Sequence, residues 1–277
     1  MNDFQTGKVY FAEGIRRYAA VWAQLLRTLR AEGVEPALLP QTESRKHIWA
    51  RDYMPVQLGA GRFLQYRYDP DYLKGYEGYI PPYEAICREL GLDCKRTELV
   101  IDGGNVVRCG DRVILTDKVL QENPRYSWGQ LLMRLEEALE AEVCLIPWDR
   151  GERYGHADGM VRAIGPGEVL INNYGDLEPT FRGRLKAALE GAGLRVAELR
   201  YGLPHPSPHS WAYLNFLQVN NCIFVPGLDL PEDALAVAQL QALYPRRHVV
   251  LVPACRPLVR LGGALNCVSW TVQVDEP

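Results

Sequence analysis

A polar residue recurs at nearly even intervals along the 277-residue chain, each time beside a run typical of a β-strand. These five residues, here called the anchor residues, are Asp52, Asp102, Asp158, Asn215 and Asn266, spaced 50, 56, 57 and 51 residues apart. Self-similarity at a fixed period is typical of architectures built from repeated supersecondary units. The spacing therefore predicts five similar units.

Each unit is expected to contain short strands and one amphipathic helix. Helical periodicity predicts helices over residues 14–33, 81–90, 128–141, 180–191 and 231–243. β-Type runs predict strands over residues 63–68, 100–107, 113–116, 143–147, 159–164, 169–173, 196–199, 214–220, 223–226, 249–253 and 265–274.

Two architectures fit this order. Five units closed into a ring would bury every sheet edge, as in propellers, and would bring the anchor residues to one axis. In that case the first helix packs on a sheet formed by residues 249–253 and 265–274. An ordinary open α/β sheet with about five crossovers is the alternative. No internal stretch has the composition of a linker, so we expect one domain.

Composition excludes several classes of function. Thirty-one Lys and Arg face 34 Asp and Glu, and no basic run fit to neutralise phosphates occurs, so we expect no nucleic-acid partner. No stretch approaches 18 consecutive apolar residues, and no signal peptide is recognisable, so we expect no membrane partner. Seven scattered cysteines without a Cys-x-x-Cys pair predict a reducing, cytoplasmic location.

Two motifs in the first half place carboxylates beside predicted strands. Trp49-Ala50-Arg51-Asp52 is followed by Pro55, and it is either a surface turn with an ion pair or a carboxylate aimed into a pocket. Asp102-Gly103-Gly104-Asn105 has adjacent glycines, which allow close approach of the backbone to another group. Taken alone, the second motif is more often a plain turn.

A third motif combines an imidazole with a carboxylate. His156 and Asp158 lie two positions apart, and in an extended segment such residues point to the same side. A metal site would need further ligands, and no other cluster has metal-ligand spacing. The pair therefore favours acid–base chemistry beside a cation-binding carboxylate, without a metal. Of the other histidines, His47 is expected at the surface or a strand end.

Cys267 differs from the other cysteines in its context. Cys87, Cys94, Cys109, Cys144, Cys222 and Cys255 lie in apolar or helical runs, where cysteine acts as a small hydrophobic residue. Cys267 follows Gly262-Gly263 and begins a predicted strand. Together with a well-placed histidine, this is the pattern of a nucleophilic cysteine enzyme, and a buried core cysteine is the alternative.

In their order, these motifs resemble those of the agmatine deiminase and bacterial peptidylarginine deiminase family, part of the guanidino-modifying, or pentein, superfamily. The series reads Trp-x-Arg-Asp-x-x-Pro, (Glu/Asp)-Gly-Gly, His-x-Asp, Asn-Phe-x-x-x-Asn and Gly-Gly-x-x-x-Cys, from Trp49 onward. The resemblance implies a five-bladed α/β propeller with pseudo-fivefold ββαβ-type repeats, forming one catalytic domain over residues 1–277. It also implies a deiminase that releases ammonia from an arginine-derived amine or peptidyl arginine.

The resemblance further implies roles at matching positions. The implied site comprises Cys267 as nucleophile, His156 as acid–base and Asp102 as a third catalytic residue, with Asp52, Asp158, Trp49 and Asn215 binding substrate. Two positions depart from the family pattern. Asp102 stands where agmatine deiminases usually carry a glutamate, and Asn266 stands where they tend to have histidine.

The chemistry is physically reasonable without the family. A guanidinium is planar and cationic at ordinary pH, so carboxylates can hold it while a thiolate attacks its central carbon. No metal or organic cofactor is required. Nearby carboxylates are expected to raise the thiol pKa until the cationic substrate arrives. An amidinotransferase, a methylarginine dihydrolase and a non-catalytic guanidinium-binding protein remain alternatives, and a homo-oligomer is left open.

Overall fold

The computed structural model describes residues 7–40 and 47–273, in which fifteen strands form five three-stranded sheets. In each sheet the middle strand pairs antiparallel with one neighbour and parallel with the other. The sheets are β3 (Val56–Gly59), β4 (Arg62–Arg67) and β5 (Cys94–Val100); β6 (Val107–Cys109), β7 (Arg112–Thr116) and β8 (Glu142–Ile146); β9 (Val161–Gly165), β10 (Glu168–Ile171) and β11 (Arg195–Glu198); β12 (Leu217–Val219), β13 (Cys222–Pro226) and β14 (His248–Val252); and β15 (Ser269–Val272), β1 (Lys8–Phe11) and β2 (Ala37–Leu38). The predicted series of five similar units is confirmed.

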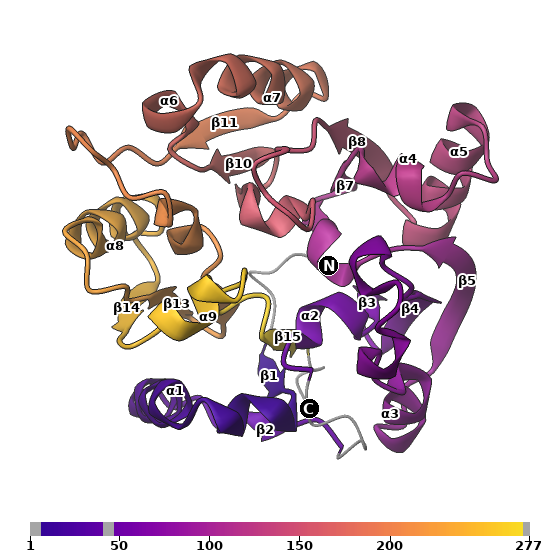
Figure 1. The fold of residues 1–277 in the computed structure, drawn as a ribbon, viewed down its shortest axis with the longest axis horizontal. Coiled ribbons are helices and arrows are strands. Elements are labelled where there is room, and N and C mark those ends of the chain that lie inside the picture. Colours follow the sequence, from indigo (N-terminus) through magenta and orange to yellow (C-terminus); the bar gives the residue numbers. More distant parts are fainter. Residues whose placement is uncertain (1–6, 41–46, 274–277) are drawn as a thin grey trace.

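A helix links the two parallel strands of each sheet, because a parallel pair needs a crossover. These helices are α1 (Ala19–Ala31), α3 (Tyr83–Glu89), α5 (Trp128–Leu139), α7 (Pro179–Gly191) and α8 (Glu232–Leu243). They match the five predicted helices to within a few residues at either end. Shorter helices are α2 (Ala50–Tyr53), α4 (Lys118–Glu122), α6 (Tyr174–Leu177) and α9 (Arg256–Arg260). Figure 1 shows the sheets arranged around a common centre, with the five crossover helices on the outside.

The fifth sheet combines the two ends of the described chain. β15 pairs antiparallel with β1, and β1 pairs parallel with β2 after the α1 crossover. The first helix therefore completes the last unit, as predicted. The prediction that residues 249–253 and 265–274 share a sheet is wrong, because β14 pairs with β13 and β15 pairs with β1. Helix α1 does pack against β14 of the neighbouring unit.

Three predicted strands, over 100–107, 214–220 and 265–274, are too long. Each ran through an anchor residue, whereas the structure places the anchors before the first strand of their sheets. The reason is that the anchor segments bond to one another instead of to a ladder. The Asn266 backbone N–H donates to the Asn215 carbonyl at 3.0 Å, and the Arg51 N–H donates to the Cys267 carbonyl at 3.1 Å.

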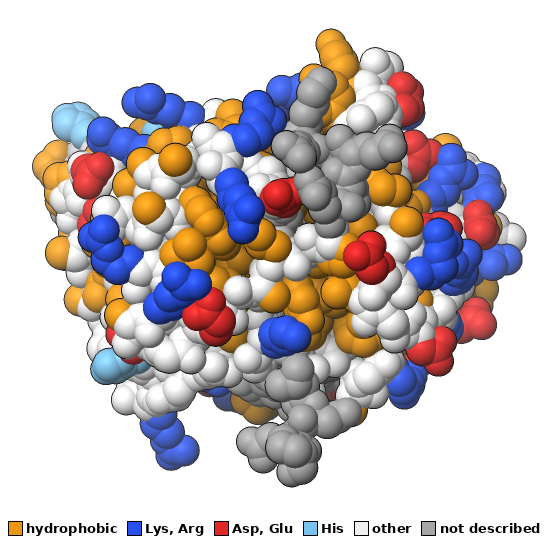
Figure 2. All heavy atoms as spheres, turned by 90° about the horizontal axis from the view of Figure 1, so that it is seen from below, with side chains coloured by type: hydrophobic (Ala, Val, Ile, Leu, Met, Phe, Trp, Pro, Cys, Tyr) orange, Lys and Arg blue, Asp and Glu red, His pale blue; other side chains and the backbone are white. Residues whose placement is uncertain are grey.

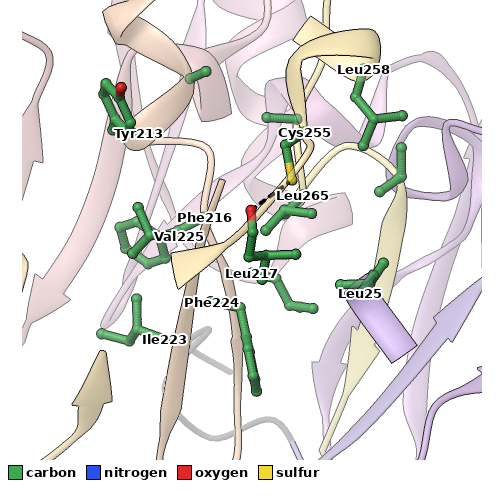
Figure 3. Packing of buried hydrophobic residues seen from close by; sticks show 14 of the residues in the cluster. Leu25, Tyr213, Phe216, Leu217, Ile223, Phe224, Val225, Cys255, Leu258 and Leu265 are labelled. Carbon is green, nitrogen blue, oxygen red and sulfur yellow. Dashed lines mark hydrogen bonds between the residues drawn. The ribbon is translucent and has the colours of Figure 1, made fainter. Parts of the chain in front are cut away.

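The largest apolar cluster joins the last two sheets to α1. Figure 3 shows Leu25 of α1 facing Phe224 of β13 and neighbouring side chains of that sheet, with Cys255 and Leu258 above them. Every residue of β13 is buried. Cys255 thus belongs to the core, as its apolar context predicted.

On the face drawn in Figure 2, basic and acidic side chains are interspersed and form no continuous field of one sign. None of the helices within residues 7–40 and 47–273 combines the length and apolar character needed to cross a bilayer.

Candidate active site

The anchor residues converge although more than two hundred residues separate the first from the last. Asp52 lies in α2. Asp102 directly precedes the 3₁₀ turn Gly103–Asn105, and Asp158 lies within the 3₁₀ turn Ala157–Gly159. Asn215 precedes β12, and Asn266 precedes β15. All five are buried. Direct hydrogen bonds link several of these segments, so the turns that begin the sheets form one polar cluster.

A cavity of about 290 Å³ opens beside this cluster. Four of the predicted site residues line it: Trp49, Asp52, His156 and Cys267. The other lining residues are Tyr18, His47, Ile48, Tyr72, Leu73, Tyr79, Arg153, Tyr154, Leu261 and Gly262. Asp102, Asp158 and Asn215 are not among the lining residues and lie behind them. Asn215 hydrogen-bonds to the backbone of Cys267 and Asp158, and its role in binding substrate stays a prediction.

Cys267 is held through its backbone and through its side chain. Its N–H donates to Asn215 Oδ1 at 3.2 Å, and its Sγ lies 3.7 Å from Asp158 Oδ2. Burial, with 7 % of the residue exposed, raises the thiol pKa well above its ordinary value, and the charges of Asp158 and Asp52 raise it further. The shift has the predicted direction, so the thiol keeps its proton at neutral pH unless a cation offsets these charges.

His156 lies between two carboxylates. Its Nε2–H donates to Asp102 Oδ2 at 2.9 Å, and its Nδ1 lies 3.6 Å from Asp52 Oδ1. Burial alone would lower the imidazole pKa, but the charges of Asp52 and Asp102 and the hydrogen bond to Asp102 outweigh it and raise the pKa to about 10. The ring is therefore an imidazolium at neutral pH. Asp102, although one methylene shorter than glutamate, reaches it directly.

Asp52 lines the cavity, and its Oδ1 is buried without a hydrogen-bond partner within the described residues. Burial raises the pKa of this carboxyl to about 7; the charge of His156 opposes that shift and those of Asp102 and Asp158 add to it. A guanidinium in the cavity would offer N–H donors to the carboxyl group of Asp52.

Asp158 is oriented by Asn266, one of the two departures from the family pattern, and by Asn215. Asn266 Nδ2 donates to Asp158 Oδ2 at 2.6 Å, and Arg51 Nη2 donates to Asn266 Oδ1 at 3.1 Å. Asn215 Nδ2 donates to the Asp158 carbonyl at 3.3 Å. Arg51 therefore acts through Asn266, and it is not the surface ion-pair partner of Asp52 that the motif also allowed.

The glycines of the motifs permit close packing around the cavity. A Cβ on Gly104 would lie 2.6 Å from His156 Nδ1 and 2.7 Å from Asp52 Oδ1, and a Cβ on Gly263 would lie 2.2 Å from the Trp49 ring. The Asp-Gly-Gly motif is consequently more than a turn, because only glycine lets its backbone pass beside His156 and Asp52.

Sequence reasoning missed several wall residues. His47, predicted at the surface or a strand end, is buried against the Tyr53 and Tyr68 rings, and burial lowers its pKa to about 4. The rings of Tyr72 and Tyr154 lie 5.0 Å apart, each about 6 Å from the His156 ring. Only Tyr154 had a signal, its place in the His156 motif. The described residues contain no group of three or more His, Cys, Asp or Glu side chains that could hold a metal ion.

With this geometry in place, the chain can be compared with known proteins. The model of the Porphyromonas-type peptidyl-arginine deiminase family matches residues 9–273. The chain belongs to this family. It is 30 % identical to agmatine deiminase of Pseudomonas fluorescens over 63 % of this chain and 57 % of that protein. It is 26 % identical to agmatine deiminase of Pseudomonas putida over 96 % of this chain and 86 % of that protein.

Solved structures show the same fold. Agmatine deiminase of Enterococcus faecalis superposes with a TM-score of 0.77 at 19 % identity, covering 99 % of this chain and 95 % of that one. SxtG, an amidinotransferase from Microseira wollei, gives 0.65 at 14 % identity, covering 100 % and 97 %. The comparisons confirm the predicted family, a pentein-like α/β fold and the deiminase class of C–N hydrolases.

Proposed function

We propose that this chain is a cysteine-dependent deiminase that hydrolyses the guanidinium of an arginine-derived compound and releases ammonia. One observation carries the proposal: Cys267, an imidazolium His156 and the carboxyl group of Asp52 belong to residues that line the same cavity. These three groups supply a nucleophile, a proton donor and a partner for a cation, which is the set that the reaction needs.

The first half-reaction forms a covalent thiouronium. The guanidinium binds in the cavity beside Asp52, with the charge of Asp158 behind the wall next to Cys267. Its positive charge lowers the pKa of the Cys267 thiol, whose proton passes to solvent. The thiolate adds to the central carbon, and the His156 imidazolium donates a proton to one amino group of the tetrahedral adduct. That C–N bond breaks, ammonia leaves, and the carbon remains bound to Sγ as a thiouronium.

The second half-reaction releases a ureido product. Neutral His156 takes a proton from water as the oxygen adds to the thiouronium carbon. The C–S bond breaks, which regenerates the thiolate, and the proton lost from the new C–OH group passes to solvent, where the released ammonia becomes ammonium. The thiolate takes back a proton from solvent once the product has left, and His156 is again the imidazolium. Asp102 stabilises the histidine cation through its hydrogen bond at 2.9 Å.

We also propose that the five sheets close into a five-bladed ring forming one cytoplasmic catalytic domain. The pairing of β15 with β1 supports closure, because it joins the two ends of the described chain in one sheet. The common arrangement of all five sheets and the meeting of their anchor residues support it too.

The departures at Asp102 and Asn266 favoured a binding protein without turnover among the alternatives. In the structure, Asp102 still contacts His156 and Asn266 still contacts Asp158, so neither departure breaks the site. The direct contact at His156 therefore favours turnover over binding alone.

Products from a panel of guanidines test the proposal. The panel contains agmatine, arginine, 4-guanidinobutyrate, peptidyl arginine and methylated arginine, and ammonia, alkylamine and ureido product are measured. Agmatine and 4-guanidinobutyrate form a matched pair, because their tails carry opposite charge and Arg153 is the single Lys or Arg among the described lining residues. A haloacetamidine labels Cys267 in the wild type and not in Cys267→Ser.

Each outcome selects one function. Ammonia with ureido product supports a deiminase, whereas alkylamine release indicates a dihydrolase. Amidino transfer to an added amine indicates an amidinotransferase, and binding without any product indicates a binding protein. Absence of both binding and labelling would remove the guanidine site altogether.

A further inference from the structure

Lys118, in helix α4, is a buried lysine that the reaction described above does not use. Only 1 % of this residue is exposed, and it is one of the largest fully buried side chains of the described chain. A buried ammonium is strongly destabilising unless charges and hydrogen bonds compensate for its lost hydration. Its contacts therefore show what holds it there.

Three carboxylates and one ring surround the Lys118 ammonium. Nζ lies 3.1 Å from Asp71 Oδ1 and 3.4 Å from Asp102 Oδ2, and it donates to Glu122 Oε1 one turn along α4. It also lies 5.0 Å from the centroid of the Tyr72 ring. Asp71 and Tyr72 belong to the turn Asp71–Leu73, whose Tyr72 and Leu73 line the cavity.

The contact of Lys118 with Asp102 links the lysine to the catalytic centre. Asp102 Oδ2 accepts from Lys118 Nζ and from His156 Nε2, while Asp102 Oδ1 has no hydrogen-bond partner within the described residues. Two cations thus converge on one carboxylate oxygen. Because His156 and Lys118 share this acceptor, the lysine charge opposes protonation of the imidazole, while it favours the ionised form of Asp102.

The surrounding backbone is shaped to admit the lysine. Gly155, the residue before His156, has φ +69°, and a Cβ there would lie 2.6 Å from Lys118 Cδ and 2.9 Å from the Trp148 ring. Thr116 Oγ1, two residues before Lys118, donates to the Gly155 carbonyl. The lysine stem and the segment that carries His156 therefore pack as one unit.

We propose that Lys118 is a positioning residue of the deiminase: it holds Asp102 against His156 and fixes the Asp71–Leu73 wall of the cavity over the same histidine. This inference rests on the proposed function for its kinetic consequences only. The contact of Lys118 with Asp102 controls how readily His156 gives up its proton as acid and takes one as base. The contact of Lys118 with Asp71 controls the shape of the cavity.

The groups that face these two cations are defined by the structure. Asp102 and Asp52 face His156 directly, with Asp158, Tyr72 and Tyr154 nearby. Asp71, Asp102, Glu122 and Tyr72 face Lys118. Loss of Lys118 leaves His156 with its carboxylates and without the opposing charge, so the proton on His156 is bound more tightly.

The test compares Lys118→Met with Lys186→Met, which removes a half-buried lysine of α7 that pairs with Glu190 at i,i+4. We measure kcat and KM from pH 6 to 11, and we follow the His156 ring by NMR titration without substrate. We expect kcat to fall about 10–100-fold, as for loss of other residues that orient a reacting group. The His156 midpoint and the matching kinetic limb should both move up by about one pH unit or more, and Lys186→Met should change neither.

A second variant separates the effects of the two contacts, with Asp102 and with Asp71. Asp71→Asn keeps the lysine on Asp102 and loosens the wall, so KM should rise while the pH limbs stay in place. If Lys118→Met fails to fold because Glu122 is left buried and unpaired, Lys118→Met/Glu122→Gln removes both charges and takes its place. A folded variant with unshifted His156 midpoint overturns the proposal, even if kcat falls. If no guanidine is turned over by the wild type, the proposed function fails, and the NMR titration still decides the role of Lys118.

Discussion

Replacing Gly104 by alanine tests whether the Asp-Gly-Gly motif exists for close approach. The added Cβ would lie 2.6 Å from His156 Nδ1 and 2.7 Å from Asp52 Oδ1, whereas ordinary contacts begin at 3.4 Å. Both side chains are buried, and His156 is also tied to Asp102, so they cannot simply swing into solvent. One of them, or the backbone, has to move by about 0.8 Å.

A displacement of this size has a large kinetic effect. Misplacing a reacting group by about 1 Å reduces rates by about 10²-fold, which corresponds to about 2.7 kcal/mol of transition-state stabilisation. Overpacking of a tight site also costs about 1–3 kcal/mol of folding stability. This loss of stability has little effect on the rate at 25 °C as long as the variant stays folded. We therefore expect kcat/KM of Gly104→Ala to fall about 100-fold with the fold retained.

The assay pairs steady-state ammonia release with thermal unfolding. Gly159→Ala is the matched control, because Gly159 lies three residues after His156, is not in the left-handed region, and its Cβ would meet nothing within 4 Å. The control should retain near wild-type activity. If Gly104→Ala is folded and its kcat/KM stays within about threefold of the wild type, the steric argument and the placement of His156 beside Asp52 are refuted.

Three further predictions concern the same cavity. Cys267→Ser should abolish turnover and remain folded, since a hydroxyl is a far weaker nucleophile than a thiolate. The control Cys222→Ser should have nearly wild-type activity. If Cys267→Ser keeps activity within tenfold of the wild type, Cys267 is not the nucleophile. Asp52→Asn and Asp158→Asn should each weaken transition-state binding by about 2–5 kcal/mol and weaken binding of an unreactive guanidine in calorimetry, and unchanged binding by both would place the cation elsewhere. Folding raises the pKa of His156 from 6.5 to about 10, so its proton stabilises the fold fully below about pH 6.5 and progressively less as the pH rises through 10. The melting temperature should therefore fall between pH 7 and 10, and this fall should be smaller in His156→Gln; equal slopes would contradict the assigned charge.

Much of the fold could be predicted because its signals are local. Side-chain periodicity reports which face of a helix is buried, and it located α5 and α7 to within two residues. The even spacing of the anchor residues identified five units before any contact was known. Strand limits were less accurate near Asp102 and Asn266, because apolar residues flank these buried turns and only the backbone hydrogen bonds show where the strand begins.

The sequence by itself also determined which residue types were available for chemistry. The order of the motifs identified Cys267, His156 and the carboxylates, together with the family they indicate. It could not show that Asp102 contacts His156 directly, nor that Asp158 and Asn215 lie behind the cavity wall, since these facts concern residues far apart in the chain.

Only the tertiary structure decided the ionisation states and the supporting contacts. Burial raises the thiol pKa of Cys267 and lowers the pKa of His47, whereas the imidazolium of His156 results from carboxylates that distant segments bring to it. Both burial and these contacts are properties of the packed interior and not of neighbouring residues in the chain. Lys118 illustrates this limit most clearly. In the sequence it is an unremarked lysine of a short helix, and it becomes part of the site because β7 and the turn before His156 pack so that its ammonium has no solvent and three carboxylates as neighbours.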